Sequence, residues 1–297
     1  MTSEPVVAAT RAQLVDLLAP ARATGARVGL VPTMGALHEG HSSLVRVARG
    51  AIGDGPLVVS VFVNPLQFGA GEDLDRYPRT LAADLALCAG EGVDVVFAPG
   101  ADEVYPNGIP TSSTNQSVTI EPGRLATILE GRTRPGHFRG VLTMVAKLFG
   151  LVRPEVAVFG EKDYQQLALV RRMVADLCLD VDVVGAVTMR EPDGLALSSR
   201  NRYLDAEQRQ QALALSRALR AAQVAAASGA LSARDAALAE LAKEPAVGLD
   251  YLAVTSPDLA DLPGDVPPGT DARMLVAARV GSTRLIDNLP LVIGETP

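Results

Sequence analysis

The chain has no tryptophan, and its 297 residues include only two cysteines and three histidines. Aromatic residues make up 4% of the sequence and hydrophobic residues 48%, so the core must be mostly aliphatic. An excess of basic residues is also missing: 27 Lys and Arg stand against 34 Asp and Glu, which gives a net charge of −7. Because a nucleic-acid-binding surface usually needs a basic stripe, we expect no nucleic-acid partner.

Long apolar runs are missing as well. No stretch has the uninterrupted apolar length of a membrane-spanning helix, and the N-terminal MTSEPVVAATRAQLVDL contains no apolar leader segment. Cys88 and Cys178 lie in apolar, helix-like segments, which favours two buried free thiols over a disulfide. We therefore expect a cytoplasmic protein with no membrane partner. Its 31.0 kDa are enough for two domains.

Strand-like and helix-like patterns alternate through the first two-thirds of the chain. Continuous apolar runs predict strands at 27–31, 56–63, 93–99, 155–160 and 181–187. Helical patterns lie between them, at 42–51, 80–92, 141–152 and 163–177. This alternation is typical of a parallel sheet covered on both faces, so we predict a Rossmann-like, doubly wound α/β domain over residues 1–187.

The pattern changes beyond that point, and residues 188–297 are predicted to form a smaller α+β domain. An Ala-rich helix is expected at 206–229, followed by a helix at 232–244 that begins with a capping box of Ser232 and Asp235. Strand patterns for a small antiparallel sheet follow at 251–257, 274–281 and 283–289. Within the first domain, the polar segment 108–123 predicts an exposed loop.

Two of the three histidines, His38 and His41, lie in one short stretch, VPTMGALHEGHSSL at 31–44. Three interpretations compete: a metal site, a phosphate site at the start of a helix, and a chance pair in a loop. The HEGH spacing is too short for the zincin pattern, which needs two histidines at i and i+4. A third ligand would have to come from the distant His137 or from a remote carboxylate. We therefore expect no zinc.

The position of this stretch favours the phosphate site. It comes directly after a strand and directly before a helix, with Gly35 and Gly40 inside it. Such a junction directs main-chain N–H groups and the positive end of the helix dipole at one point, and glycines let a phosphate approach the backbone. Imidazoles there can donate hydrogen bonds as negative charge builds up on phosphate oxygens.

Three further stretches carry chemistry. Gln67 in VFVNPLQFG follows a strand, where ligands of open α/β sheets bind, although turn capping by its amide is an equal alternative. Lys162 in FGEKDYQQL suits a phosphate, and Asp163 beside it suits a helix cap. The Ser-Ser-Arg triplet at 198–200 in GLALSSRNRYL adds two hydroxyls and a cation, which is a weak signal by itself.

The histidine turn resembles the HIGH-type signature of the nucleotidyltransferase superfamily, and the Ser-Ser-Arg loop resembles its KMSKS-type phosphate loop. Further stretches extend the match: EDLDRYPRTL (72–81), EGRTRPGHFRGV (130–141) and TRLIDN (283–288). In order and spacing, the motifs resemble those of the pantothenate synthetase family from about Thr10 to Asn288.

This resemblance implies an ATP-dependent ligase that joins pantoate to β-alanine through a pantoyl adenylate, releasing AMP and pyrophosphate. It implies catalytic roles for His38, His41, Lys162 and Arg200, with His41 as the proton donor. The implied ATP-binding residues are Met34, Gly35, Ala36, Leu37, His38, Glu39, Gly40, His41, Gly160, Glu161, Lys162, Asp163, Met189, Leu197, Ser198, Ser199 and Arg200. Gln67 and Gln166 are the implied pantoate ligands, and Gln67 also lies where β-alanine enters.

The resemblance further implies Mg²⁺ accompanying ATP, no tightly bound organic cofactor, a homodimer, and a C-terminal domain that closes over the active site. Other function classes stay open. An adenylyltransferase for a phosphorylated precursor would share the histidine turn but would need a second phosphate pocket. A tRNA-charging synthetase is disfavoured by the acidic charge and the lack of an anticodon-binding domain. A non-catalytic nucleotide-binding protein would not need His38, His41, Lys162 and Arg200 all intact.

Overall fold

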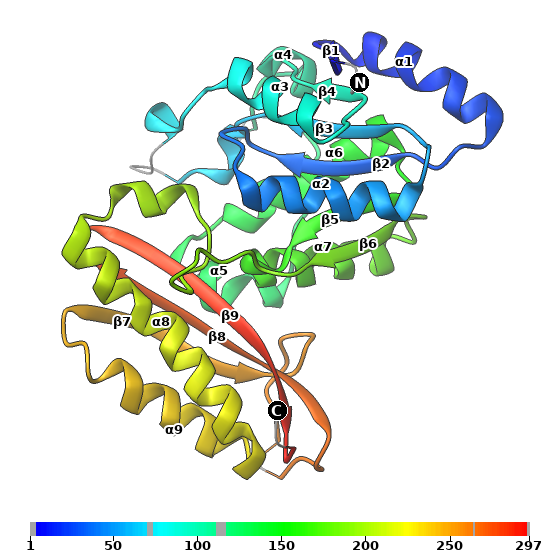
Figure 1. Cartoon of the computed structure of the whole chain (residues 1–297). Coiled ribbons are helices and arrows are strands. Elements are labelled where there is room, and N and C mark those ends of the chain that lie inside the picture. The colour runs from blue at the N-terminus through cyan, green and yellow to red at the C-terminus, as the bar shows by residue number, and fades with distance from the viewer. Residues whose placement is uncertain (1–3, 70–73, 111–116, 264, 296–297) are drawn as a thin grey trace. The chain divides into compact units, whose positions relative to one another are not determined.

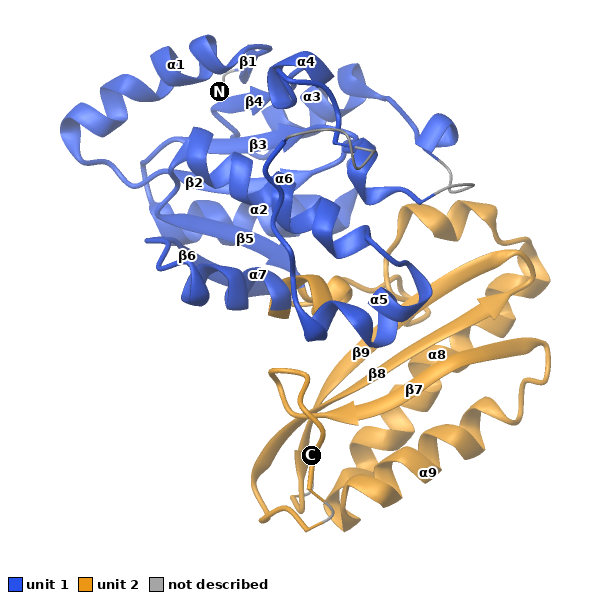
Figure 2. Cartoon of the chain, turned by 180° about the vertical axis from the view of Figure 1, so that it is seen from behind, with its two compact units in different colours: residues 1–160, 169–186 blue, residues 161–168, 187–297 orange. Residues whose placement is uncertain are grey.

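The structure is a computed structural model that describes residues 4–69, 74–110, 117–263 and 265–295. The chain divides into two compact units, which Figure 2 shows in different colours. Unit 1 comprises residues 1–160 and 169–186, and unit 2 comprises residues 161–168 and 187–297. The short segment 161–168 thus groups with the C-terminal part of the chain, although the residues on both sides of it belong to unit 1.

Unit 1 is built on a six-stranded parallel sheet with the strand order β1-β4-β3-β2-β5-β6 (Figure 1). The strands are β1 Val6–Ala8, β2 Gly29–Thr33, β3 Leu57–Val61, β4 Val95–Phe97, β5 Val156–Gly160 and β6 Asp182–Ala186. From β2 the chain runs outward through β3 and β4, and it then returns to β5 on the other side of β2. The predicted doubly wound fold is confirmed. Its switch point lies at the C-terminal ends of β2 and β5, where such sheets bind ligands.

Helices cover both faces of this sheet because its central strands are buried and apolar. The helices are α1 Arg11–Thr24, α2 Glu39–Ile52, α3 Leu81–Gly90, α4 Ala101–Val104, α5 Leu129–Thr133, α6 His137–Val152 and α7 Tyr164–Asp176. Helix α2 packs Val45, Ala48 and Ile52 into a core cluster with the strands, and α1 packs against α6. The first residues of α7, up to Ala168, belong to unit 2.

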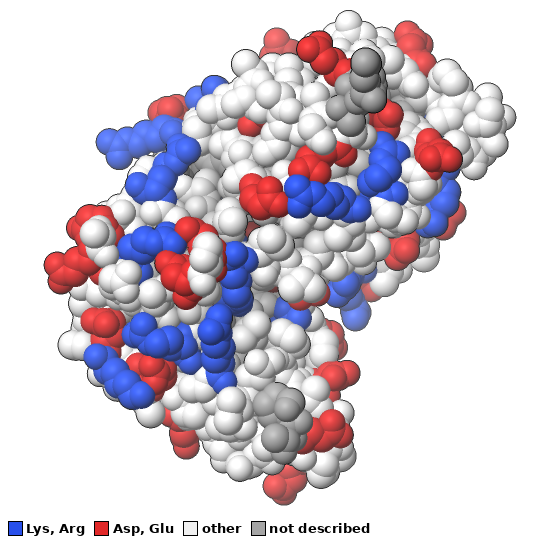
Figure 3. Space-filling model, in the orientation of Figure 1, with Lys and Arg blue, Asp and Glu red and all other residues white. Residues whose placement is uncertain are grey.

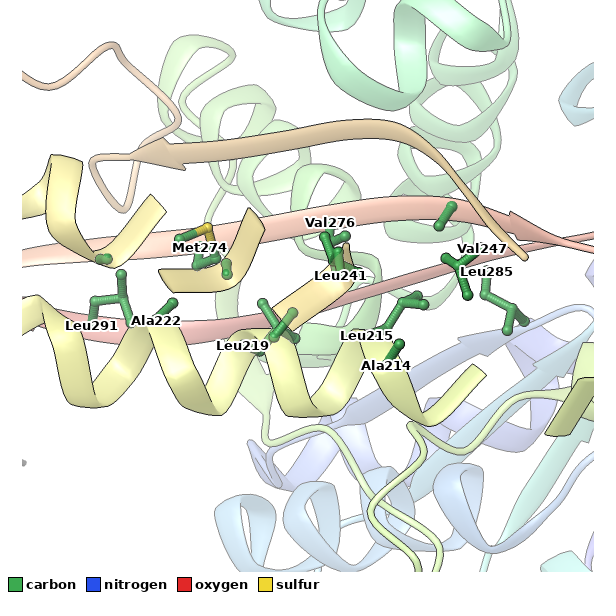
Figure 4. Packing of buried hydrophobic residues seen from close by; sticks show 14 of the residues in the cluster. Ala214, Leu215, Leu219, Ala222, Leu241, Val247, Met274, Val276, Leu285 and Leu291 are labelled. Atoms are coloured by element: carbon green, nitrogen blue, oxygen red, sulfur yellow. The ribbon is translucent and has the colours of Figure 1, made fainter. Parts of the chain in front are cut away.

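Unit 2 contains an antiparallel sheet of β7 Val247–Thr255, β8 Thr270–Val280 and β9 Thr283–Ile293, in that order. Two helices, α8 Ala206–Ala225 and α9 Ala230–Leu241, pack against the sheet. Figure 4 shows the core between them, where Leu215 and Leu219 of α8 share one cluster with Met274 and Val276 of β8. The predicted α+β arrangement is confirmed.

Several sequence predictions were wrong in detail. Helix α2 begins at Glu39 rather than at residue 42, so His41 lies in its first turn and not in a loop. Helix α9 begins at Ala230 with Gly229 as its N-cap, and the Ser232 hydroxyl donates to the main-chain oxygen of Ser228 at 3.1 Å. The predicted capping box at Ser232 is therefore absent, because that residue already lies inside the helix.

The two cysteines also differ from each other. Cys88 is buried in α3 as expected, and burial raises the pKa of its thiol to about 12. Cys178 is exposed, which contradicts the prediction of a second buried thiol. Helix α7 ends at Asp176, and Cys178 lies in the turn that follows, with a left-handed φ of 54°.

In the predicted loop at 108–123, residues 111–116 lie outside the described part, and the described flanks contain neither helix nor strand. Over all described residues, no helix combines the length and the apolar character needed to cross a membrane.

Candidate active site

The connection between β2 and α2 is a tight left-handed turn. Gly35 has a φ of 81° and Ala36 a φ of 53°. A Cβ atom built on Gly35 would lie 3.0 Å from Oδ2 of Asp84 and 3.0 Å from Cγ1 of Val61. Both the backbone conformation and the close packing therefore require glycine at this position.

Asp84 of α3 binds the main chain of this turn. Asp84 is only 2% exposed, and its carboxylate accepts the N–H of Leu37 at 2.8 Å and that of Ala36 at 3.2 Å. The Thr80 hydroxyl donates to it at 3.2 Å. A buried carboxylate is stable only with such donors, so Asp84 and the turn hold each other in place. Asp84 was missed in the sequence, where its only signal is one carboxylate in an otherwise apolar helix.

His38 and His41 lie together at the N-terminus of α2, with their ring centroids 4.2 Å apart. Nδ1 of His38 accepts the main-chain N–H of Gly40 at 3.1 Å, and Nδ1 of His41 accepts that of His38 at 3.2 Å. Because a main-chain nitrogen only donates, both Nδ1 atoms are acceptors and the ring protons are on Nε2. The helix cap thus fixes two imidazoles as Nε2 donors beside the positive end of a helix.

The side chain of Glu39, also in this turn, points to a different partner. It forms an ion pair with Arg46 of the same helix, at 2.6 Å between Oε1 and Nη1, and about half of it is exposed. Basic and acidic side chains are interspersed on the face of the molecule that Figure 3 shows. An exposed ion pair such as that of Glu39 and Arg46 contributes little to stability.

Gln67 lies in a short 3₁₀ helix, Pro65–Gln67, that follows β3. Its Oε1 accepts the Nδ2–H of Asn64 at 3.0 Å, and Asn64 itself is fully buried. Asn64 caps the 3₁₀ helix by accepting the N–H of Leu66 at 3.3 Å. The amide of Gln67 is therefore held by a neighbouring amide, and the turn-capping role that the sequence left open for Gln67 belongs to Asn64.

In unit 2, residues 161–163 form a 3₁₀ helix directly after β5 and directly before α7. The amide of Asn288 in β9 donates to the main-chain oxygens of Glu161 at 2.9 Å and of Lys162 at 3.0 Å. Arg273 of β8 donates to the Glu161 carboxylate at 3.1 Å. These contacts fix the backbone from which Lys162 projects. Asn288 and Arg273 were not identified in the sequence, although TRLIDN was recognised as a motif.

The side chain of Lys162 is 17% exposed, and its Nζ lies 3.9 Å from Oδ2 of the more exposed Asp163. This distance is too long for a hydrogen bond, so the pair leaves the ammonium able to donate to a ligand. Gln166, one helical turn further along α7, is half-buried. Gly160, which ends β5, lies in unit 1.

The Ser-Ser-Arg triplet is also held in a defined turn. Ser198 caps a 3₁₀ helix over Ser199–Tyr203, and its hydroxyl accepts the N–H of Arg200 at 3.3 Å. Before it, the N–H of Leu197 donates to the main-chain oxygen of Met189 at 2.9 Å. Met189 lies three residues beyond the end of β6 at Ala186.

An ion-pair network supports this turn from within unit 2. The Glu191 carboxylate accepts from Arg209 of α8 at 2.6 Å and from the amide of Asn201 at 2.8 Å. These hydrogen bonds, that from Arg209 first, hold the pKa of Glu191 below its usual range. Arg209 also bonds Asp193 at 2.6 Å, so the loop of 190–201 is tied to α8.

The structure thus brings His38 and His41 together in unit 1, in the same unit as Gln67, and it places Lys162, Gln166 and the triplet at 198–200 in unit 2. No group of three or more His, Cys, Asp or Glu side chains suited to a metal ion occurs among the residues described. The arrangement within each unit presents donors and cations, which suits a polyphosphate more than a resident metal.

Comparisons with known proteins agree with this chemistry. A family profile described as pantoate-beta-alanine ligase matches residues 6–290. A pantothenate synthetase from Nocardioides sp. is 69% identical, over 99% of this chain and 87% of that protein. One from Thermobifida fusca is 56% identical, over 97% of this chain and 96% of that protein.

Solved structures are similar over nearly the whole chain. The crystal structure of pantothenate synthetase from Thermus thermophilus has a TM-score of 0.83 and 49% identity, covering 96% of this chain and 98% of that one. A pantoate-beta-alanine ligase from Francisella tularensis, complexed with beta-gamma ATP and beta-alanine, has a TM-score of 0.76 and 32% identity. The match covers 99% of each chain.

Proposed function

The chain belongs to the pantoate–β-alanine ligase family, and from that premise we propose how its residues divide the reaction among them. It is an ATP-dependent ligase of pantoate and β-alanine. In the first step that we propose, a pantoate carboxylate oxygen bonds to the α-phosphorus of ATP, and pyrophosphate leaves. In the second, the free amine of β-alanine bonds to the acyl carbon, AMP leaves, and the amine loses a proton.

The observation that carries this proposal is the Nε2 donor pair of His38 and His41 at the N-terminus of α2. A carboxylate that attacks a polyphosphate faces like-charge repulsion, and preorganised donors offset the charge that builds up on the phosphates. We assign His41 as the principal donor to the leaving phosphates, with His38 beside it. Lys162 and Arg200 supply the cationic charge, and each projects from a backbone that unit 2 holds in place.

The proposed nucleotide contacts follow the turns described above. Met34 to His41 supply main-chain N–H groups and the two rings, and Glu39 contributes through its backbone because its carboxylate pairs with Arg46. Gly160 to Asp163 and Leu197 to Arg200 complete the phosphate contacts. Met189 contacts the nucleotide with its main chain, although its carbonyl oxygen is already bound to Leu197.

Gln67 and Gln166 are the proposed ligands of pantoate, and Gln67 also contacts β-alanine. The pantoate-beta-alanine ligase from Francisella tularensis is complexed with beta-gamma ATP and beta-alanine, which supports the assignment of those substrates. We further propose that residues 1–187 form the ATP- and pantoate-binding domain and that residues 188–297 close over the bound nucleotide.

Mg²⁺ is proposed to enter with ATP, and it would supply charge neutralisation on the phosphates. The described residues form no cluster of three carboxylate or histidine ligands, and this fits a cation held by phosphate oxygens and water with at most one carboxylate of the chain. Zinc and a tightly bound organic cofactor have no part in the proposal. Metal analysis of the protein purified without chelator should find no stoichiometric zinc; one equivalent whose removal abolishes activity would contradict this.

A homodimer is proposed from the family resemblance, and light scattering at micromolar concentration tests it: the expected mass is twice 31.0 kDa. The reaction itself is tested by incubating the purified chain with ATP, Mg²⁺, pantoate and β-alanine. AMP and pantothenate should form in equal amounts, and omission of pantoate should stop AMP release. AMP formation that does not depend on pantoate would contradict the proposed substrate.

A further inference from the structure

A buried hydrogen-bond network surrounds Gln67, and it involves residues to which the proposed reaction assigns no role. Tyr105, at the C-terminal end of α4, is 4% exposed, and its hydroxyl donates to Oδ1 of Asn64 at 2.6 Å. Burial raises the pKa of the Tyr105 phenol, so the hydroxyl keeps its proton. His137 and Arg134 bind the main-chain oxygen of Gln67, at 2.8 Å from Nδ1 and 3.1 Å from Nη2.

The orientation of the Asn64 amide follows from two main-chain partners. The N–H of Leu66 can only donate, so the Asn64 atom that faces it is Oδ1. The carbonyl of Gly140 can only accept, so the atom at 3.0 Å from it is Nδ2. With Tyr105 and Gln67 added, both lone pairs of Oδ1 and both hydrogens of Nδ2 are used, and the amide cannot be turned over without losing them.

The orientation of the Asn64 amide determines that of the Gln67 amide. Because Nδ2 of Asn64 donates, the Gln67 atom that it meets at 3.0 Å must be the acceptor Oε1. The Nε2 end of the Gln67 amide, with its two hydrogens, is therefore turned away from Asn64. Among the described residues, no partner accepts from this Nε2.

The main chain of Gln67 is fixed by a second set of contacts. Arg134 donates to Nε2 of His137 at 3.1 Å, and a guanidinium can only donate. The proton of His137 is therefore on Nδ1, from which it donates to the Gln67 carbonyl. Gly140 lets α6 approach this segment, since a Cβ atom there would lie 2.2 Å from the main-chain oxygen of Leu66. Both the side-chain amide and the main-chain carbonyl of Gln67 are thus held in place before any ligand binds.

We infer that Tyr105 and His137 are positioning residues that hold Gln67 as a hydrogen-bond donor, so that this position selects a substrate oxygen that accepts. This inference rests on the proposed contact between Gln67 and pantoate, whose carboxylate accepts hydrogen bonds only. Tyr105 acts on the side chain of Gln67 through Asn64, and His137 acts on its main chain together with Arg134. A preorganised donor does not lose conformational entropy on binding, which raises affinity for the substrate that matches it.

The test is a double-mutant cycle with Tyr105→Phe and Gln67→Ala, measured in the exchange of labelled pyrophosphate into ATP that pantoate supports. Tyr105→Phe keeps the ring and removes one hydrogen bond, so the KM for pantoate should rise about three- to tenfold. The KM for ATP should change little, and the midpoint of thermal unfolding should fall by only a few degrees, as expected for the loss of one buried hydrogen bond. In the Gln67→Ala background, the same substitution should have no further effect on pantoate, because the only route to the substrate is gone.

Tyr251→Phe, the same change on β7 of unit 2, is the matched control and should leave both KM values unchanged. His137 provides the second arm. His137→Leu should raise the KM for pantoate about tenfold, and His137→Asn, whose amide can donate from the Nδ1 position, should recover most of that loss. A residue that is needed only for folding would not separate the two KM values in this way.

The inference is overturned if Tyr105→Phe keeps the wild-type KM for pantoate, or if its effect is as large in the Gln67→Ala background as in the wild type. It is also overturned if Gln67→Ala keeps the wild-type KM for pantoate, because Gln67 would then not contact pantoate. These results differ from a failure of the proposed function, in which the wild-type chain would show no exchange that depends on pantoate.

Discussion

Proton positions decide what the histidines of this chain can do. His38 and His41 use Nδ1 to accept main-chain N–H groups, so they donate from Nε2. His137 has the opposite arrangement, with Nε2 accepting from Arg134 and Nδ1 donating to Gln67. The sequence alone does not distinguish the three histidines. Their hydrogen-bond partners identify His38 and His41 as candidate catalytic donors and His137 as a proposed positioning residue.

Replacing His41 by Ala should lower the rate of the first half-reaction by about 10²- to 10³-fold, because it removes one preorganised donor. The measurement is single-turnover formation of the adenylate at saturating ATP and pantoate. His41→Gln, whose Nε2 can take the place of the imidazole Nε2, should recover part of the loss. Near-normal turnover in His41→Ala would refute the assignment.

We expect substitution of Asp84 to affect both stability and ATP binding, because its carboxylate binds the main chain of the turn between β2 and α2. Asp84→Asn would place an amide nitrogen against one of the two N–H groups that the carboxylate now accepts. We expect a loss of about 1–3 kcal/mol in the free energy of unfolding and about a tenfold rise in the KM for ATP. Urea denaturation and steady-state kinetics measure the two. Asp102→Asn, at an exposed position of α4, should change neither, and an unaltered KM for ATP in Asp84→Asn would show that the turn does not need this carboxylate.

At the scale of the elements, the sequence predicted the strands of unit 1 well, because buried parallel strands appear as continuous apolar runs. It missed β1 and α1. Strand β1 is short and lies at the edge of the sheet, and α1 contains Pro20, so the hydrophobic pattern of each is weak in the sequence. It placed the start of α2 too late because Gly40 is a poor helix former, whereas the His38 cap stabilises the first turn in the structure.

The candidate site was predictable only in part for a related reason. Residues that follow a strand or begin a helix, such as His38, Gln67 and Lys162, have a local signature in the sequence. Tyr105 has none, because its partner Asn64 is 41 residues away in the chain. The lone carboxylate of Asp84 in an apolar helix does not reveal that it binds Ala36, which is 48 residues away. A buried polar group is explained only by what folding brings next to it.

The loop of 190–201 predicts a pH effect. The pKa of Glu191 is lowered in the folded chain, so its ion pair with Arg209 adds stability above the ordinary value of 4.5 and loses it as the pH falls through the folded pKa. In Glu191→Gln this contribution is absent. The difference in unfolding free energy between wild type and variant should therefore be largest above pH 4.5 and shrink as the pH falls below that value. Denaturation curves at several pH values measure it, and a difference that is constant with pH would exclude the ionised pair as its source.

The core of unit 2 predicts a stability effect. Leu219 of α8 is fully buried in the cluster of Figure 4. Leu219→Ala should destabilise unit 2 by about 2–5 kcal/mol, as expected for a cavity in a packed core. Val224→Ala, on the same helix but 68% exposed, should cost much less. Thermal unfolding of the two variants measures both losses. Equal losses of stability would mean that the cluster does not determine the stability of this unit.

For the whole molecule, the division into two units has a direct consequence for the proposed chemistry. The histidine pair and Gln67 belong to unit 1, whereas Lys162, Gln166 and Arg200 belong to unit 2. A reaction that uses residues of both units needs the complete chain. The family match over residues 6–290 includes residues of both units.

The central claim is that the acyl group is activated on AMP before the amine arrives. Three side chains that could otherwise form an acyl-enzyme are unsuited to it. Cys88 is buried with a raised pKa, and the Ser198 hydroxyl is engaged as a helix cap. Cys178 is exposed, but it follows the C-terminal end of α7, the opposite end of that helix from Gln166. The most direct test is exchange of labelled pyrophosphate into ATP with enzyme, Mg²⁺ and pantoate, and without β-alanine. The account predicts exchange that depends on pantoate and needs no amine. Exchange that strictly requires β-alanine would contradict it and would show a concerted reaction of all three substrates.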